Sequence, residues 1–329
     1  MLVDLYRACQ SAGVHPSIED FPGLRGTVTG ALDELQDTSI YRWGPVFPCK
    51  AAGQAAVLKR TASPLGDALG VAAWTTAMAK AGIGVVAPLD LSATGGPAGP
   101  IEVGDDVWVV YPWVGGRPYD GSPADVAAAG DLLGRLHAAG ATAHGLPEFD
   151  WPDHDEESIA EDVEALAGAL GADAQPLQGL VQRFPTQVLP AIRDAGLPMV
   201  DASMDYKANN LVFADGGPVL VDPDNGERLP RLLDLALAVL LFHSEHDPAP
   251  GRPFDAAEWA SFRDAWARHV TPTADERRLW PTALEYMLSE WVVWQITDSD
   301  ALGDESEDPR QGSLLRALAA VDVHAYPLD

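Results

Sequence analysis

The chain has 329 residues, of which 47% are hydrophobic, so it is long enough to bury a full core and to form two lobes. Its 49 acidic and 21 basic residues give a formal net charge of −28, which argues against nucleic acid or an anionic membrane as a partner. That charge permits a cationic small-molecule substrate, although solubility alone accounts for most acidic surfaces.

The N-terminal part predicts a short extension and no targeting signal. Residues 1–24 are expected to form a helical extension with one helix from Leu2 to Ala12, and no basic stretch is followed by an apolar core. No apolar run reaches the roughly 18–20 residues that span a bilayer. The two cysteines, Cys9 and Cys49, lack metal-ligand or redox spacing, which fits a reducing cytosol. We expect a cytoplasmic protein that does not enter a membrane.

A β-rich part is predicted over residues 25–114. Its first strands cover Asp37–Cys49 and Gln54–Arg60, and the second of these carries Lys59, one of only four lysines in the chain. A lysine at the end of an apolar strand can supply a point charge to phosphate oxygens, although most lysines simply lie in solvent.

A helix and a hairpin complete this part. The helix is predicted over Leu65–Ala81. Its acidic residue Asp67 either interacts favourably with the helix dipole or pairs with Lys59. Residues 90–114 are predicted to form a hairpin with a Gly/Pro-rich tip at Ala93–Pro100 and a second strand at Val107–Trp113.

From residue 115 to 329 the pattern is mainly helical. A helix from Ser122 ends in L-G-R-L-H-A-A-G, and its His137 is expected to be a packed structural histidine. The acidic run Asp153–Glu157 precedes an amphipathic helix over Ser158–Leu170, either because carboxylates favour helix N-termini or because they line a cleft for a cationic substrate. Further helices are predicted over Pro176–Ala195 and Pro281–Thr297.

The stretch Asp201–Asp224 carries the chemistry. Asp205 is followed five residues later by Asn210, and Asp222 comes twelve residues after that. Two apolar runs around a Gly-rich turn predict a β-hairpin that brings Asn210 close to Asp222. A carboxylate and an amide oxygen held together on loops are hard ligands of the kind that Mg²⁺ takes beside substrate phosphates. Asp205 would then receive a proton from a hydroxyl that attacks phosphorus, although an ordinary Asx-rich turn has a similar composition.

Several short segments occur once each and in one order. They are V-L-K at Lys59, an apolar strand, L-G-R-L-H at His137, D-x-K-x-x-N from Asp205, and L-V-D ending on Asp222. Together they resemble the aminoglycoside phosphotransferase and choline kinase family. The resemblance implies an α+β, protein-kinase-like fold of two lobes, with the β-rich part as the N-lobe and the helical part as the C-lobe.

The resemblance also implies roles for single residues. Asp205 would orient and deprotonate the acceptor hydroxyl, and Lys207 would offset charge on the transferred phosphoryl group. Asn210 and Asp222 would hold Mg²⁺, and Lys59 would bind the phosphates of ATP or GTP. Further nucleotide contacts are expected at Thr38, Ser39, Val110, Tyr111 and Trp113.

The implied activity is transfer of the γ-phosphate of ATP or GTP to a hydroxyl of a small, amino-bearing molecule. The acceptor would be an aminoglycoside-like antibiotic or a related natural product, with an amino alcohol or sugar of primary metabolism as the alternative.

Departures from the family pattern keep a pseudokinase, a nucleotide-binding or scaffold module, as a second interpretation. Leu35–Ser39 has no glycine, the following helix lacks the family's glutamate, and Ser203 replaces a histidine. Asp234, in R-L-L-D-L-A, is expected to be a helix cap that holds the catalytic loop.

Overall fold

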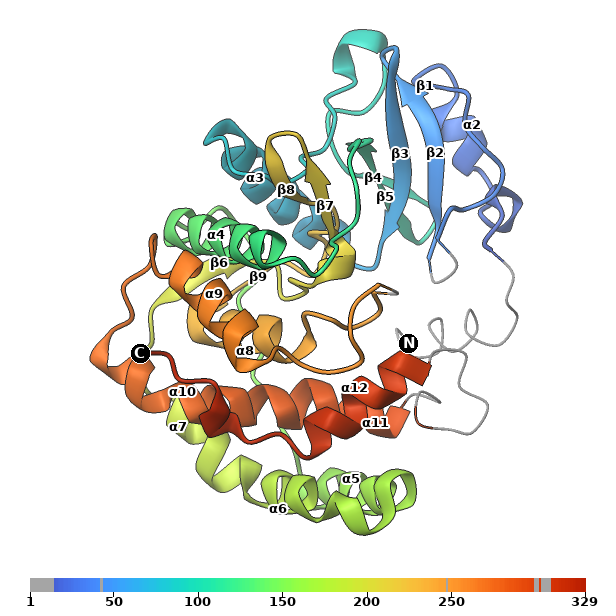
Figure 1. The fold of residues 1–329 in the computed structure, drawn as a ribbon. Coiled ribbons are helices and arrows are strands. Elements are labelled where there is room, and N and C mark those ends of the chain that lie inside the picture. The colour runs from blue at the N-terminus through green and yellow to red at the C-terminus, as the bar shows by residue number, and fades with distance from the viewer. Residues whose placement is uncertain (1–14, 42–43, 247, 299–301, 303–308) are drawn as a thin grey trace. The chain divides into compact units, whose positions relative to one another are not determined.

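The computed structural model of the chain describes residues 15–41, 44–246, 248–298, 302 and 309–329 (Figure 1). The helix expected over Leu2–Ala12 lies outside these residues. The chain divides into two compact units: the first contains the chain up to Gly115 with His144–Pro147 and Val221–Gly226, and the rest forms the second. The three-part division predicted from the sequence stays a prediction. None of the described helices is long and apolar enough to cross a membrane.

The first unit is built on a five-stranded antiparallel sheet with the strand order β1-β2-β3-β5-β4. Its strands are β1 (Leu32–Asp33), β2 (Val46–Ala51), β3 (Gln54–Thr61), β4 (Ile101–Val103) and β5 (Asp106–Pro112). Its helices are η1 (Ile18–Asp20), α2 (Leu24–Val28), α3 (Leu65–Lys80) and η2 (Ser92–Thr94), of which η1 and η2 are 3-10 turns. Ala52 and Gly53 both have positive φ and join β2 to β3 in a turn that matches the twist of a hairpin.

Two predictions about these strands are wrong. Residues 37–41 do not form a strand and belong to the loop between β1 and β2, because the Ser39 hydroxyl bonds to backbone groups of the loop and competes with strand pairing. The later hairpin turns at Gly104 and Asp105 and not at Ala93–Pro100, since Gly104 supplies the positive φ of 64° that a tight turn needs.

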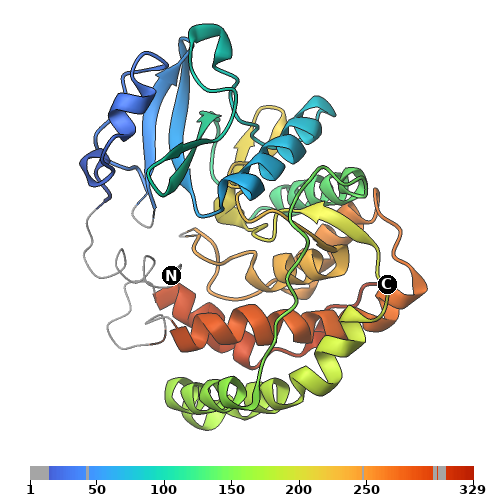
Figure 2. The same cartoon turned by 180° about the vertical axis from the view of Figure 1, so that it is seen from behind.

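Helix α2 lies beside β1 and β2 in both views (Figures 1 and 2). Leu24 and Val28 are four residues apart and therefore lie on one face of this helix. They are buried in one cluster with Ile18, Phe47 and Trp108. The stretch before α2 thus contributes to the core of the first unit.

The second unit is mainly helical and contains two strand pairs, β6 with β9 and β7 with β8. Its strands are β6 (Met199–Ala202), β7 (Leu211–Ala214), β8 (Gly217–Leu220) and β9 (Glu227–Pro230). Its helices are α4 (Pro123–Gly140), α5 (Glu156–Leu170), η3 (Gly171–Ala174), α6 (Gln175–Arg183), η4 (Phe184–Val188), α7 (Leu189–Arg193), η5 (Ala208–Asn210), α8 (Arg231–Leu241), α9 (Ala256–Trp266), α10 (Ala274–Met287), η6 (Leu288–Val292), α11 (Val293–Asp298), α12 (Pro309–Ala319) and η8 (Val323–Ala325).

The predicted helices are present, with two interruptions. Both η4 and η6 are π-helical and divide the helices expected over 176–195 and 281–297. The carboxylate of Asp155 accepts the N–H of Ser158 (2.8 Å), so at this residue the acidic run caps α5.

Helix α4 approaches α9 and β6 closely because glycines face both neighbours. A Cβ atom at Gly130 would lie 2.2 Å from the carbonyl oxygen of Phe262 on α9. At the end of the helix, a Cβ atom at Gly140 would lie 2.3 Å from the carbonyl oxygen of Asp201 on β6. Only glycine permits backbones to come this near, so these positions fix where α4 lies against both elements.

The loop after β6 is anchored by a buried chain of hydrogen bonds. The N–H of Met204 donates to one carboxylate oxygen of Asp234 (3.0 Å), and Nε2 of His137 donates to the other (2.7 Å). Nε1 of Trp266 donates to Nδ1 of His137 (3.1 Å). Because an indole N–H can only donate, Nδ1 must accept, and the imidazole is neutral with its proton on Nε2.

This series of hydrogen bonds confirms that His137 is structural and that Asp234 holds the loop. The predicted capping role of Asp234 is wrong, because the N-cap of α8 is Pro230 and Asp234 lies in the first turn. Met204 has a φ of 52°, which is uncommon for a residue other than glycine. The loop therefore depends on the buried carboxylate to keep this backbone conformation.

Replacing Gly130 with alanine should destabilise the second unit, because the added methyl group would overlap the Phe262 carbonyl. We expect the free energy of unfolding, measured by urea denaturation, to fall by about 1–3 kcal/mol, the usual cost of overpacking. Gly168→Ala on the exposed side of α5 is the matched control, since a Cβ there meets no atom within 4 Å. The control should be neutral or gain up to about 1 kcal/mol. Unchanged stability of Gly130→Ala would contradict the close approach.

Replacing Asp234 with asparagine should also destabilise the protein. An asparagine side chain has one acceptor oxygen, so either the Met204 N–H or the His137 Nε2–H loses its buried acceptor, at a cost of about 1–3 kcal/mol. Asp215→Asn, in the exposed turn between β7 and β8, should stay within about 0.5 kcal/mol of wild type in the same denaturation experiment. Equal effects of the two substitutions would rule out the proposed anchor.

Candidate functional site

The predicted hairpin is confirmed. Strand β7 pairs with β8 in the register Leu211 to Leu220, so Asn210 immediately precedes the paired region. Asp222 follows Leu220 by two residues, in the segment that belongs to the first unit. The polar groups of each unit are therefore described separately.

In the second unit, Asp205 is held by Asn210. The Nδ2 group of Asn210 donates to the carboxylate of Asp205 (2.8 Å) and to its carbonyl oxygen (3.0 Å). Asn210 is buried, whereas the Asp205 side chain is 25% exposed. The carboxylate is thus fixed in direction and still open to a small molecule.

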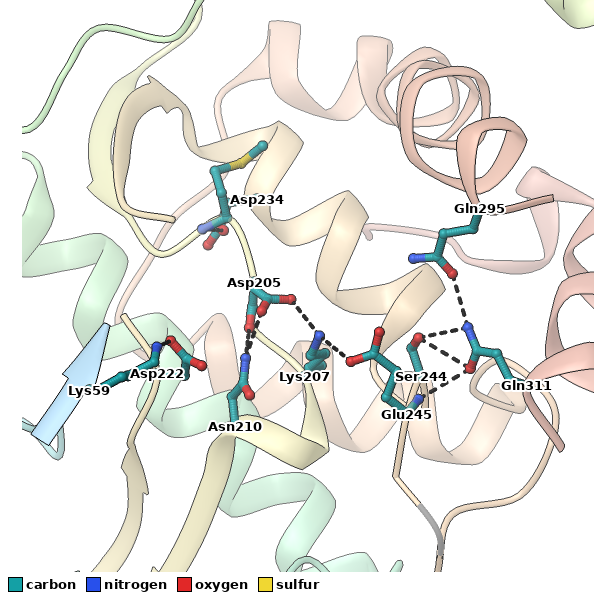
Figure 3. A network of polar contacts seen from close by, with 11 residues as sticks. Lys59, Asp205, Lys207, Asn210, Asp222, Asp234, Ser244, Glu245, Gln295 and Gln311 are labelled. Carbon is teal, nitrogen blue, oxygen red and sulfur yellow. Dashed lines mark hydrogen bonds and ion pairs between the residues drawn. The ribbon is translucent and has the colours of Figure 1, made fainter. Parts of the chain in front are cut away.

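Lys207 adds a cation beside this carboxylate. Its Nζ lies 3.1 Å from Oδ1 of Asp205 and donates to Oε2 of Glu245 at 2.8 Å (Figure 3). The Lys207 side chain is 15% exposed, so water screens these contacts less than it would at the surface. Asp205, Lys207 and Asn210, three residues expected to act together, lie together.

In the first unit, Lys59 on β3 pairs with two carboxylates. Its Nζ donates to Asp222 and to Oδ2 of Asp224 (2.7 Å). The predicted pair between Lys59 and Asp67 is wrong: Asp67 lies in the first turn of α3, as its helix-dipole interpretation expects. Burial would lower the pKa of Lys59, but the charges of Asp222 and Asp224 outweigh it and raise that pKa above its ordinary value. Lys59 is therefore a permanent cation.

Asp224, which the sequence left without a definite role, is part of this cluster. It is 8% exposed, and Oδ1 accepts a hydrogen bond from the Tyr111 hydroxyl (3.2 Å). Its carbonyl oxygen accepts the hydroxyl of Ser63 (3.1 Å). Burial raises the pKa of Asp224, an effect that Lys59 opposes. Asp224 thus connects strands β3 and β5 to the segment that carries Asp222.

Tyr111 was expected to contact a nucleotide through its backbone, which stays a prediction, and its hydroxyl orients Asp224. The ring is buried, and burial raises its pKa well above the ordinary value, so the hydroxyl stays a neutral donor.

Ser39 is buried and takes part in the folding of its own loop. Its hydroxyl accepts the N–H groups of Tyr41 (3.1 Å) and Val46 (2.9 Å), and it lies 2.8 Å from the carbonyl oxygen of Gly44. The Ser39 hydroxyl is therefore occupied within its own loop and is not free to bind phosphate. Thr38 is exposed and stays a predicted phosphate contact.

The backbone groups expected to contact a nucleotide base are largely occupied. The carbonyl of Val110 accepts the N–H of Leu89 (2.9 Å), and the N–H of Trp113 donates to Ala55 (3.0 Å). Since hydrogen-bonding directions alternate along a strand, the carbonyl of Pro112 points away from β3. The carbonyl of Val110 and the N–H of Trp113 therefore have partners within the protein, and the nucleotide contacts expected at these two residues stay predictions. The carbonyl of Pro112 is a further candidate at the end of the strand.

Two further polar residues near Asp205 are structural or unassigned. Asp201 is fully buried and pairs with Arg228 (2.9 Å), so its carboxylate is not exposed to a small molecule. Ser203, at the position of the family's histidine, is buried, and its hydroxyl has no hydrogen-bond partner among the described residues. The anchor on Asp234 acts one residue further along, at Met204.

Glu245 was missed by sequence reasoning. It lies 38 residues beyond Lys207 and four beyond the end of α8, in a segment with no motif. Only the folding of α8 back toward the loop brings the two side chains together. No local sequence signal identifies this pair.

Comparison with known proteins identifies the family and the fold. The model of the phosphotransferase enzyme family matches residues 45–286, which is most of the chain. A glucosamine kinase from Streptacidiphilus jiangxiensis is 28% identical over 164 residues, 43% of this chain and 37% of that protein. The chain thus spans little more than a third of the length of this relative.

Two solved structures share the fold. The amicoumacin kinase hAmiN in complex with AMP-PNP, Ca²⁺ and Ami gives a TM-score of 0.61 at 15% identity, over 90% of this chain and 92% of that chain. An aminoglycoside phosphotransferase from Alicyclobacillus acidocaldarius gives 0.58 at 17% identity, over 92% and 93%. The kinase-like α+β fold predicted from the motif order is confirmed, and the chain belongs to the phosphotransferase enzyme family.

Proposed function

We propose that this protein transfers the γ-phosphoryl group of ATP or GTP to a hydroxyl of a small, amino-bearing molecule. The observation that carries the proposal is the Asp205 carboxylate, which is fixed by Asn210 at 2.8 Å, lies 3.1 Å from the Lys207 ammonium and stays partly exposed. A base of this kind needs a fixed direction and access to a hydroxyl, and the ammonium beside it can offset charge on the phosphoryl group.

In the proposed reaction the acceptor oxygen attacks the γ-phosphorus. The bond from that phosphorus to the oxygen bridging to the β-phosphate breaks, and the nucleoside diphosphate leaves. The hydroxyl proton passes to the carboxylate of Asp205. Lys207 offsets negative charge on the moving phosphoryl oxygens, so the chain contributes mainly positioning and electrostatic stabilisation.

Nucleotide phosphates would bind at Lys59, whose charge is permanent because two carboxylates hold it. Its side chain is 15% exposed and ends in a fixed position on β3. Thr38 and the carbonyl of Pro112 are the further groups proposed for the phosphates and the base.

Asn210 and Asp222 are the residues proposed to hold a magnesium ion. Nδ2 of Asn210 is turned to Asp205, which leaves its amide oxygen as the ligand atom, and Asp222 supplies a carboxylate. The hairpin β7–β8 separates the two residues by a short, paired connection. A magnesium ion held there would neutralise part of the charge of the nucleotide phosphates.

An amino-bearing acceptor is favoured by two observations. The formal charge of the chain is −28, which attracts cations. The matched relative is a glucosamine kinase, and one structural neighbour is an aminoglycoside phosphotransferase. Amino sugars and aminoglycosides are therefore the first acceptors to test, and amino alcohols are next.

A nucleotide-binding module without catalysis is the alternative, favoured by Ser203 at the place of a histidine. The anchor from Asp234 to Met204 weakens that alternative, since it already holds the loop backbone next to Asp205.

Nucleotide binding is tested by thermal shift with ATP and GTP, each with and without Mg²⁺. A ligand at 100 times its dissociation constant adds about 2.7 kcal/mol of stability, so the melting temperature should rise clearly. Asp222→Ala should lose the Mg²⁺-dependent part of the rise, while Asp105→Ala, in the exposed turn between β4 and β5, should keep it. An unchanged shift in Asp222→Ala would exclude that residue as a ligand.

Catalysis is tested by coupled detection of the nucleoside diphosphate during an acceptor screen. Asp205→Asn should lower kcat by about 10²–10⁴-fold, the usual contribution of a general base, with nucleotide binding retained. Asp215→Asn should turn over like wild type. Unchanged turnover in Asp205→Asn would remove Asp205 as the base, and a wild type that binds nucleotide without any turnover would favour the binding module.

A further inference from the structure

The ammonium of Lys207 is shared between two carboxylates from distant parts of the second unit. Asp205 lies two residues before it at 3.1 Å, and Glu245 accepts its hydrogen bond at 2.8 Å. A lysine side chain has four rotatable bonds, so one carboxylate alone would not fix its position. Two carboxylates on opposite sides define where the charge lies.

Glu245 reaches this position through an unusual backbone conformation. Its φ is 57°, in the left-handed region that residues other than glycine rarely adopt. Such outliers persist only where neighbouring contacts impose them, and they often mark functional residues. The conformation at Glu245 therefore calls for a contact that imposes it.

Gln311 on α12 supplies that contact. Its Oε1 accepts the backbone N–H of Glu245 (3.1 Å), and its Nε2 donates to Oε1 of Gln295 on α11 (3.0 Å). The same amide lies 3.0 Å from the hydroxyl of Ser244, which is buried. Figure 3 shows these contacts as one continuous series from Gln295 to Asp205.

We propose that Glu245 is a positioning residue that sets the place of the Lys207 ammonium, and that Gln311 holds Glu245 in the conformation this requires. The catalytic part of this inference rests on the proposed kinase function, whereas the pairing of Lys207 does not.

The pairing is tested without any activity. The chain has only four lysines, so their reaction with an acetylating reagent can be followed singly by mass spectrometry. In Glu245→Gln the loss of one charged partner should leave the Lys207 amine more mobile and more accessible, so it should be acetylated several-fold faster, with Lys50 and Lys80 as internal references. Gln311→Ala should give a smaller increase. Glu164→Gln, on the exposed side of α5, should react like wild type, and an unchanged Lys207 rate in Glu245→Gln would overturn the proposal.

The catalytic consequence is tested by a double-mutant cycle. Glu245→Gln should lower kcat by about tenfold with the nucleotide KM unchanged, an interaction of the size found between contacting residues. In a Lys207→Met background the same substitution should have no further effect, because Glu245 acts through Lys207. Independent, multiplying losses would overturn the positioning role. If the wild type turns over no acceptor, the proposed function fails, and the acetylation rates still decide whether Glu245 positions Lys207.

Discussion

The loop after β6, which carries Asp205, depends on one buried series of hydrogen bonds. Trp266 donates to His137, His137 donates to Asp234, and Asp234 accepts the N–H of Met204, the residue before Asp205. A buried carboxylate without partners is costly, and here both oxygens have a donor. The backbone at Met204, with its positive φ, is thereby held, and the direction in which Asp205 leaves the loop follows from it.

The close approach of α4 to α9 and β6 makes this series of hydrogen bonds possible. Gly130 and Gly140 allow α4 to lie against α9 and β6, and α4 carries His137 between those two contacts. A larger side chain at either glycine would move the histidine away from Asp234. Gly130 and Gly140 therefore affect both the packing of the second unit and the geometry of the loop after β6.

Two of the four lysines are each held by a pair of carboxylates. In the first unit Lys59 contacts Asp222 and Asp224, and in the second unit Lys207 contacts Asp205 and Glu245. In the proposed function Lys59 binds the nucleotide phosphates and Lys207 offsets charge on the transferred phosphoryl group. The pairs restrict the motion of both ammonium groups before any ligand binds.

The sequence alone determined the kinase-like fold, the hairpin after Asn210 and the grouping of Asp205 with Lys207, because these follow from local spacing and motif order. Tertiary structure decided what spacing cannot encode. Ser39 was expected to bind phosphate, but its hydroxyl forms hydrogen bonds within its own loop. The carbonyl of Val110 accepts the N–H of Leu89. Glu245 reaches Lys207 only through the path of α8 and the contact with Gln311. Short-range patterns predict which residues are neighbours along an element, whereas the partner of a buried polar group depends on which distant backbone is folded against it.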